Sequence, residues 1–82
     1  MEKNCELITK ITMYDEIDSY IVQCHTKEAQ GSFVKRLNHE IDTREIIGWD
    51  VIPISENQVR INRHGDRSKT MREAIDYTLR YL

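Results

Sequence analysis

The residues best suited to chemistry in this 82-residue chain are the cations of the segment 60–72. Arginine forks bind two phosphate oxygens at once, and a loop that ends at a helix N-terminus adds backbone N–H donors. The segment therefore predicts a site for an anionic partner, either nucleic acid or a nucleotide, although Asp66 interrupts it. The alternative is a solvated loop whose arginines pair with the acidic half of the protein. The candidate anion-binding residues are Arg60, Arg63, His64, Arg67, Lys69 and Arg72.

Charge is distributed unevenly along the chain. The formal net charge is −2, but residues 1–57 carry 6 Lys or Arg against 11 Asp or Glu, whereas residues 58–82 carry 6 against 3. A domain with one acidic and one basic region has an oriented field, which favours an anionic partner at one end. The overall acidity argues against a general nucleic-acid coat protein, which would be basic throughout.

Cysteine and histidine spacing argues against a metal site. Neither C-x₂-C nor H-x₃-H spacing occurs among Cys5, Cys24, His25, His39 and His64. The chain starts without an apolar signal segment, so we expect both cysteines to be reduced thiols. No apolar run approaches the roughly 18 residues that span a bilayer. The prediction is a cytoplasmic protein without metal, cofactor or membrane anchor.

Catalysis has one candidate centre. His64 and Asp66 could act as a base and its orienting carboxylate in a phosphodiesterase-like site, with Arg63 or Arg67 on the phosphate. Such an enzyme usually adds a second carboxylate cluster that holds a metal, and the spacing here places none. A chain of 82 residues also leaves little room for a pocket of enzymatic size. We therefore expect a non-enzymatic binding or regulatory protein.

A second surface predicts a different function, in which the protein inhibits or connects other proteins. Two tyrosines flank an acidic turn and could contact a host or regulatory protein, although tyrosines at strand ends also commonly cover a small core. An exposed sheet edge near Pro53 could serve the same purpose. Because so small a domain has little core, a homodimer is also expected. The candidate protein-contact residues are Tyr14, Asp15, Glu16, Asp18 and Tyr20.

The N-terminal half must position that acidic turn. Residues 7–14 alternate in a way that favours a strand, with a helix as the competing interpretation. Residues 15–19 are polar enough for the turn, and residues 20–25 predict a second strand. Thr26 can cap a helix, whose apolar stripe is clearest from Phe33 to Asp42.

The C-terminal half must position the basic segment. Residues 46–54 predict a strand with Trp49 in the core, and residues 58–64 predict its hairpin partner. Thr70 and Glu73 form a capping-box pattern at the start of a last helix. The order ββαββα predicts one α+β domain over residues 1–82, a mostly antiparallel sheet with two helices packed on it.

Overall fold

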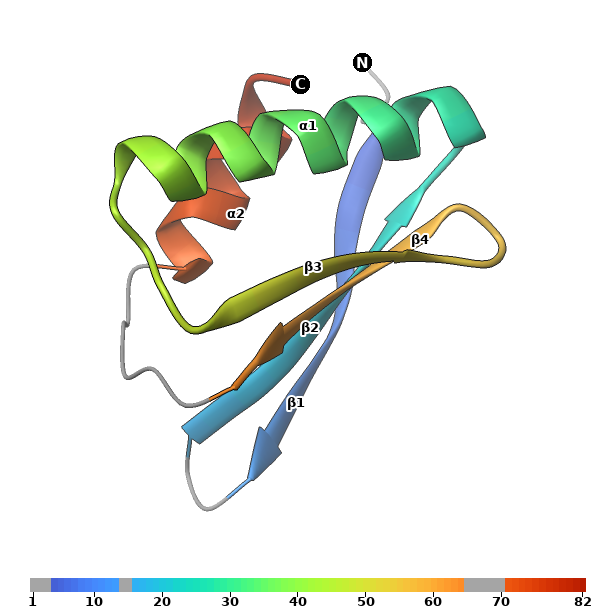
Figure 1. The fold of residues 1–82 in the computed structure, drawn as a ribbon. Helices are drawn as coiled ribbons and strands as arrows, with labels where there is room; N and C mark the ends of the chain where they lie inside the picture. The colour runs from blue at the N-terminus through green and yellow to red at the C-terminus, as the bar shows by residue number, and fades with distance from the viewer. Residues whose placement is uncertain (1–3, 14–15, 65–70) are drawn as a thin grey trace.

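The fold is a four-stranded antiparallel sheet covered by two helices on one face (Figure 1). The computed structural model describes residues 4–13, 16–64 and 71–82, with the backbone alone for residues 9, 11–13 and 16–18. The strand order in the sheet is β1-β2-β4-β3. This confirms the predicted α+β class and the order ββαββα. The elements are β1 (Cys5–Met13), β2 (Glu16–Cys24), α1 (Lys27–Thr43), β3 (Trp49–Ile54), β4 (Gln58–Arg63) and α2 (Met71–Arg80).

The first hairpin confirms the strand interpretation for residues 7–13 and excludes the helix there, whereas Tyr14 lies outside the described residues. β1 pairs with β2 through two register shifts, which lie between Leu7 and Thr9 and between Ile11 and Thr12. Pairing continues to Met13 opposite Glu16, so the predicted acidic turn over residues 15–19 is too long. Backbone hydrogen bonding to β1 extends β2 through residues whose polar side chains indicated a turn.

A disulfide also joins β1 to β2. The register places Cys5 opposite Cys24, with Cα atoms 4.0 Å apart, and their sulfur atoms are bonded. The expectation of two reduced thiols is therefore wrong for this structure. Antiparallel pairing brings together two cysteines that lie 19 positions apart in the sequence, and the spacing alone does not reveal this. Both cysteines belong to the core cluster that also holds Phe33 and Leu37.

Helix α1 begins at Lys27, six residues before the clearest part of its apolar stripe. The Thr26 hydroxyl accepts a hydrogen bond from the Ala29 N–H at 3.0 Å, which caps the helix as predicted. Gln30 connects this end of the helix to the sheet, because its buried side-chain amide donates to the carbonyl oxygens of Ile54 at 2.9 Å and Gln58 at 2.7 Å. These two bonds fix the start of α1 against the β3–β4 hairpin.

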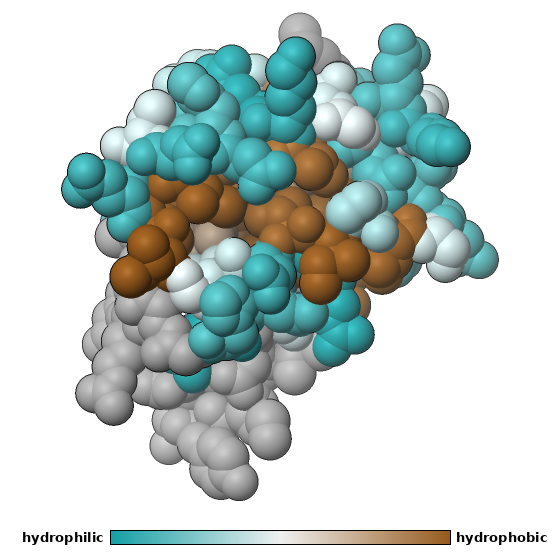
Figure 2. All heavy atoms as spheres, in the orientation of Figure 1, coloured by the Kyte–Doolittle hydropathy of each residue, from teal (hydrophilic) through white to brown (hydrophobic). Residues whose placement is uncertain are grey.

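Strand β3 starts later than predicted, because residues 46–48 form the connection from α1. Its Trp49 packs against the core, as predicted, and stacks on Tyr20 with ring centroids 5.8 Å apart. Pro53 lies in this edge strand, where a missing N–H is tolerated. Figure 2 shows a band of apolar side chains between α1 and β3, with hydrophilic side chains around it.

Helix α2 packs its apolar stripe against the rest of the core. Met71, Ala74, Ile75 and Thr78 are buried. The predicted cap at Thr70 lies outside the described residues. No helix in the described part of the chain is long and apolar enough to cross a membrane.

Candidate functional site

The cations of the predicted anion-binding segment do not share one surface. In β4, Val59 and Ile61 are fully buried beneath the helices, so alternation places Arg60 on the opposite, open face of the sheet. Arg63 has the same parity as the buried residues and is half-buried. Arg72 projects from α2. Arg67 and Lys69 lie outside the described residues.

Each described member of that segment already has a contact within the protein. The Arg60 Nε atom donates to Asn62 Oδ1 at 3.0 Å, so these two side chains share a face. His64 Nε2 lies 3.3 Å from Asp50 Oδ1, and Arg72 Nε lies 3.1 Å from Asp76 Oδ1. Arg63 is also engaged. His64 thus contacts a carboxylate of the acidic part of the chain, whereas Arg60 and Arg72 contact residues of the basic part itself. The anion-binding role of the segment therefore stays a prediction.

The structure corrects one candidate of the predicted protein-contact surface. Tyr20 is only 3 % exposed, because β2 directs it beneath the helices and onto Trp49. Burial raises the pKa of the Tyr20 hydroxyl above its ordinary 10.0, Arg72 opposes this shift, and Asp76 adds to it. Tyr20 is therefore a core residue rather than a surface contact. Tyr14 and Asp15 lie outside the described residues, as do the side chains of Glu16 and Asp18.

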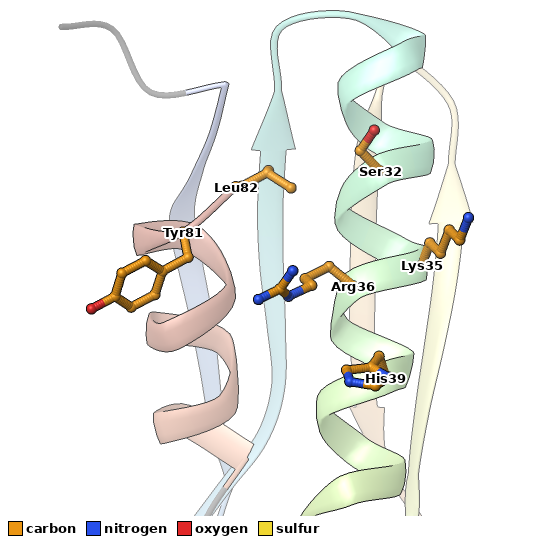
Figure 3. A pocket seen from close by; sticks show the side chains of 6 residues that line it. All are labelled: Ser32, Lys35, Arg36, His39, Tyr81 and Leu82. Carbon is orange, nitrogen blue, oxygen red and sulfur yellow. The ribbon is translucent and has the colours of Figure 1, made fainter.

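A different group of cations lines a hollow of about 480 Å³ between α1 and α2. The α1 positions recur at helical spacing and so form one face of the helix. Figure 3 shows Arg36 reaching across toward α2, Leu82 pointing toward α1, and Lys35 pointing away from α2. The hollow therefore lies where the two helices meet. Its lining residues are Ser32, Lys35, Arg36, His39, Tyr81 and Leu82.

Aromatic side chains extend this surface along α2. The rings of Tyr77 and Tyr81 lie 4.7 Å apart and are tilted by 47°. The guanidinium carbon of Arg44 lies 5.4 Å from the centre of the Tyr77 ring, a cation–π geometry. Tyr81 is 59 % exposed, and its ring points away from α1 in Figure 3. The hollow is thus flanked by an exposed tyrosine pair.

The α1 cations differ from the predicted segment in how they are engaged. Among the residues that the structure describes, none forms a hydrogen bond or an ion pair with the side chains of Lys35, Arg36 or His39. No Asp or Glu occurs from Ala29 to His39. The nearest carboxylate along the helix, Glu40, is bound to Arg44 at 3.2 Å. These side chains can therefore bind an external anion without first leaving an internal partner.

Sequence patterns did not predict this surface. Lys35 and Arg36 are not among the predicted anion-binding residues, and His39 entered only as a possible metal ligand. The available signal was an eleven-residue stretch with three cationic or titratable residues and no carboxylate. Its juxtaposition with Tyr81 and Leu82 depends on helix packing, which residue spacing does not show.

No family model matches this chain, and comparison with curated proteins and with solved structures found no similar protein. The function therefore has to be inferred from the geometry of the described residues.

Proposed function

We propose that this protein is a non-enzymatic binding protein that contacts phosphate groups of nucleic acid or a nucleotide through Lys35, Arg36 and His39. The observation that carries the proposal is that, among the described residues, these three side chains have no hydrogen-bond or ion-pair partner and lie beside a hollow between α1 and α2. Their exposure leaves them hydrated in the free protein, so binding mainly exchanges water and counterions for phosphate oxygens.

The dimensions of the hollow support a small phosphorylated group. Its volume of about 480 Å³ lies within the usual range for ligand sites, about 300 to 1,000 Å³. The Arg36 guanidinium can bind two phosphate oxygens, Lys35 adds a point charge, and the Ser32 hydroxyl adds a neutral donor. The site thus offers several hydrogen-bond donors at successive positions along α1.

The tyrosine pair favours a partner that contains bases. Aromatic side chains bind unpaired bases by stacking, which contributes about 1–3 kcal/mol per base. Tyr81 is exposed beside the hollow, and Tyr77 is held by Arg44. A single strand with phosphates on α1 and a base on Tyr81 would use both features. This arrangement favours single-stranded nucleic acid over inorganic phosphate.

The segment 60–72 remains a prediction for an additional contact. Exposed ion pairs such as Arg72–Asp76 stabilise a protein by only about 0–1 kcal/mol, so a phosphate can replace the carboxylate. Because Arg60 lies on the open face of the sheet, it cannot join the α1 cations in one compact site. In this proposal the segment increases affinity for a long strand but does not define the site.

The compartment belongs to the same proposal. Structural disulfides persist in oxidising compartments and are rare in the cytosol, so the Cys5–Cys24 bond weighs against the cytoplasmic location expected from the sequence. Alkylation of free thiols in rapidly lysed cells tests this. Two labelled cysteines per chain would support the cytoplasm, and none would support an oxidising compartment.

Fluorescence anisotropy with a labelled single strand of about ten nucleotides tests the binding proposal. Binding should be detectable at about 50 mM salt, and the variant Lys35→Glu/Arg36→Glu should weaken it more than about tenfold. The matched control, Arg60→Glu/Arg72→Glu, has the same net charge. The strand should stay uncut, as expected of a non-enzyme, and cleavage that His64→Ala abolishes would refute that part.

The two charge-reversed variants decide where the partner binds. A loss confined to the Arg60/Arg72 variant would move the site to the predicted basic segment and refute the α1 site. An equal loss in both would mean that total charge, rather than the α1 surface, governs binding. If the strand, ATP and inorganic phosphate all fail to bind at about 50 mM salt, the proposal as a whole is wrong.

A further inference from the structure

Strand β3 has an open edge. Among the described strands its neighbour is β4 alone. The His64 N–H donates to the Gly48 carbonyl at 2.8 Å, which makes Gly48 and His64 a hydrogen-bonded pair. Such pairs alternate along an antiparallel ladder, so Trp49, Val51 and Pro53 direct their backbone groups away from β4. The edge thus offers two N–H donors and three carbonyl acceptors.

Apolar side chains lie beside that edge. Val34 and Ile41 of α1 are half-buried. They lie on the same helical stripe as Gln30, whose side chain is hydrogen-bonded to the end of β3. Val51 is half-buried from the strand side. Ile47, just before the strand, is 70 % exposed. Figure 2 shows the resulting apolar band between α1 and β3.

The means by which proteins usually protect an edge strand are sparse here. Lysines, bulges and prolines normally prevent another strand from adding. Pro53 removes one donor, but no Lys or Arg occurs from Glu45 to Val59. The paired part of β3 also has no register shift against β4. A short, regular edge with an apolar side favours strand addition.

The charge around the edge indicates the kind of occupant. Three carboxylates, Glu45, Asp50 and Glu56, lie before, within and after β3 without a cation between them. A second copy of this chain, paired edge to edge, would bring these carboxylates toward the carboxylates of the other copy. Like charges across neighbouring strands destabilise a sheet. A segment with basic ends would instead be attracted.

We infer that the free edge of β3 binds an extended segment of a different protein. The segment pairs with the backbone of Trp49, Val51 and Pro53, places alternate apolar residues against the band below α1, and carries Lys or Arg at its ends. This surface is separate from the anion site on α1. Through this edge the protein would act as the adaptor expected from the sequence, without using the buried Tyr20.

A pair of synthetic peptides tests the inference. Each alternates valine and threonine, one flanked by lysines and the other by glutamates. Because Trp49 is the chain's one tryptophan and lies in β3, its fluorescence reports binding at the edge directly. The lysine-flanked peptide should bind at least about tenfold more tightly than the glutamate-flanked one. Equal affinities, or no binding of either peptide, would overturn the inference.

Surface variants locate the binding. Ile47→Lys should weaken binding of the lysine-flanked peptide at least about fivefold, because the substitution adds a cation and removes an exposed apolar contact. Ile8→Lys is the control, since Ile8 is also exposed but lies on β1, at the opposite edge of the sheet. Arg36→Glu should not weaken binding of this peptide, whatever its effect on phosphate binding. Equal effects of the two isoleucine variants would contradict the assignment to β3.

Sedimentation distinguishes a partner from a second copy. The wild-type chain should not dimerise through β3. A dimer that Ile47→Lys converts to a monomer, and Ile8→Lys does not, would show that a second copy occupies this edge and would overturn the inference. Circular dichroism of both variants checks that they are folded, which their exposed positions predict.

Discussion

Single contacts decide which side chains are available to a partner and which hold the fold. Arg44 is bound to Glu40 and stacks on Tyr77, whereas Arg36, on the same helix, has no partner among the described residues. Gln30 shows the opposite situation, a buried polar group whose amide donates two hydrogen bonds. The sequence does not single out Gln30. Its contribution to stability depends on carbonyl groups 24 and 28 positions away, which no local pattern reveals.

Replacing Gln30 with alanine should destabilise the protein. The substitution leaves the β3–β4 hairpin without two hydrogen bonds to α1, and the expected loss in unfolding free energy is about 1–3 kcal/mol. Urea unfolding followed by circular dichroism measures it. Asn38→Ala, at an exposed position of the same helix, should change stability by less than about 0.5 kcal/mol. A Gln30 variant as stable as the Asn38 variant would contradict the anchoring role.

Tyr20 should make stability depend on pH in the alkaline range. Its folded-state pKa is raised above 10.0, so the folded state holds this proton more tightly than the unfolded state does. The resulting stability is present below pH 10.0 and is lost as pH rises through the folded-state pKa. The thermal midpoint of Tyr20→Phe should therefore fall less than that of the wild type above pH 10.0. Tyr81→Phe, which alters an exposed ring, should behave like the wild type.

Among the elements, the strands carry the features that local sequence predicts least well. The apolar stripe of α1 and the strand predicted at residues 58–64 follow from periodicity, and both elements are confirmed, the strand over Gln58–Arg63. The predicted boundaries of β2 and β3 are not confirmed. Hydrogen bonding to β1 sets the start of β2, and the connection from α1 sets the start of β3. The hairpin turn is a special case, since Glu56 and Asn57 both adopt positive φ, 61° and 63°. Asn is common in that conformation and Glu is not.

The turn predicts a stabilising substitution. Glu56→Asn should raise the unfolding free energy by about 0.5–1 kcal/mol, because asparagine adopts a positive φ at lower cost. Glu56→Val should lower it by about 1 kcal/mol or more, because a β-branched residue is strained there. Denaturant midpoints of the two variants measure the difference. The same direction for both would contradict the turn geometry.

At the scale of the whole molecule, a small core is reinforced by one covalent link. The sequence predicted the architecture well, because fold class follows from the order and periodicity of its elements. It predicted the surfaces poorly. Which cations are engaged, which edge is open and which cysteines meet depend largely on packing between distant segments, as the His64–Asp50 contact, β3 and the Cys5–Cys24 pair show.

Removal of the disulfide should cost a large share of the stability. A bond that closes a loop of this length stabilises a protein by about 3 kcal/mol, chiefly by restricting the unfolded chain. Cys5→Ala/Cys24→Ala should therefore show a much lower denaturant midpoint than the oxidised wild type. Reduced wild type is the control and should resemble the variant. An oxidised protein no more stable than the reduced one would show that the link does not support this fold.

The salt dependence of oligonucleotide binding tests the proposed α1 site most directly. For single strands, the slope of log Kobs against log salt concentration is about −0.7 per neutralised phosphate. If Lys35 and Arg36 each bind a phosphate, their replacement by glutamine should make the slope less steep by about 1.4. Replacement of Arg60 and Arg72 by glutamine should change it less. An unchanged slope in the Lys35/Arg36 variant would contradict the α1 site.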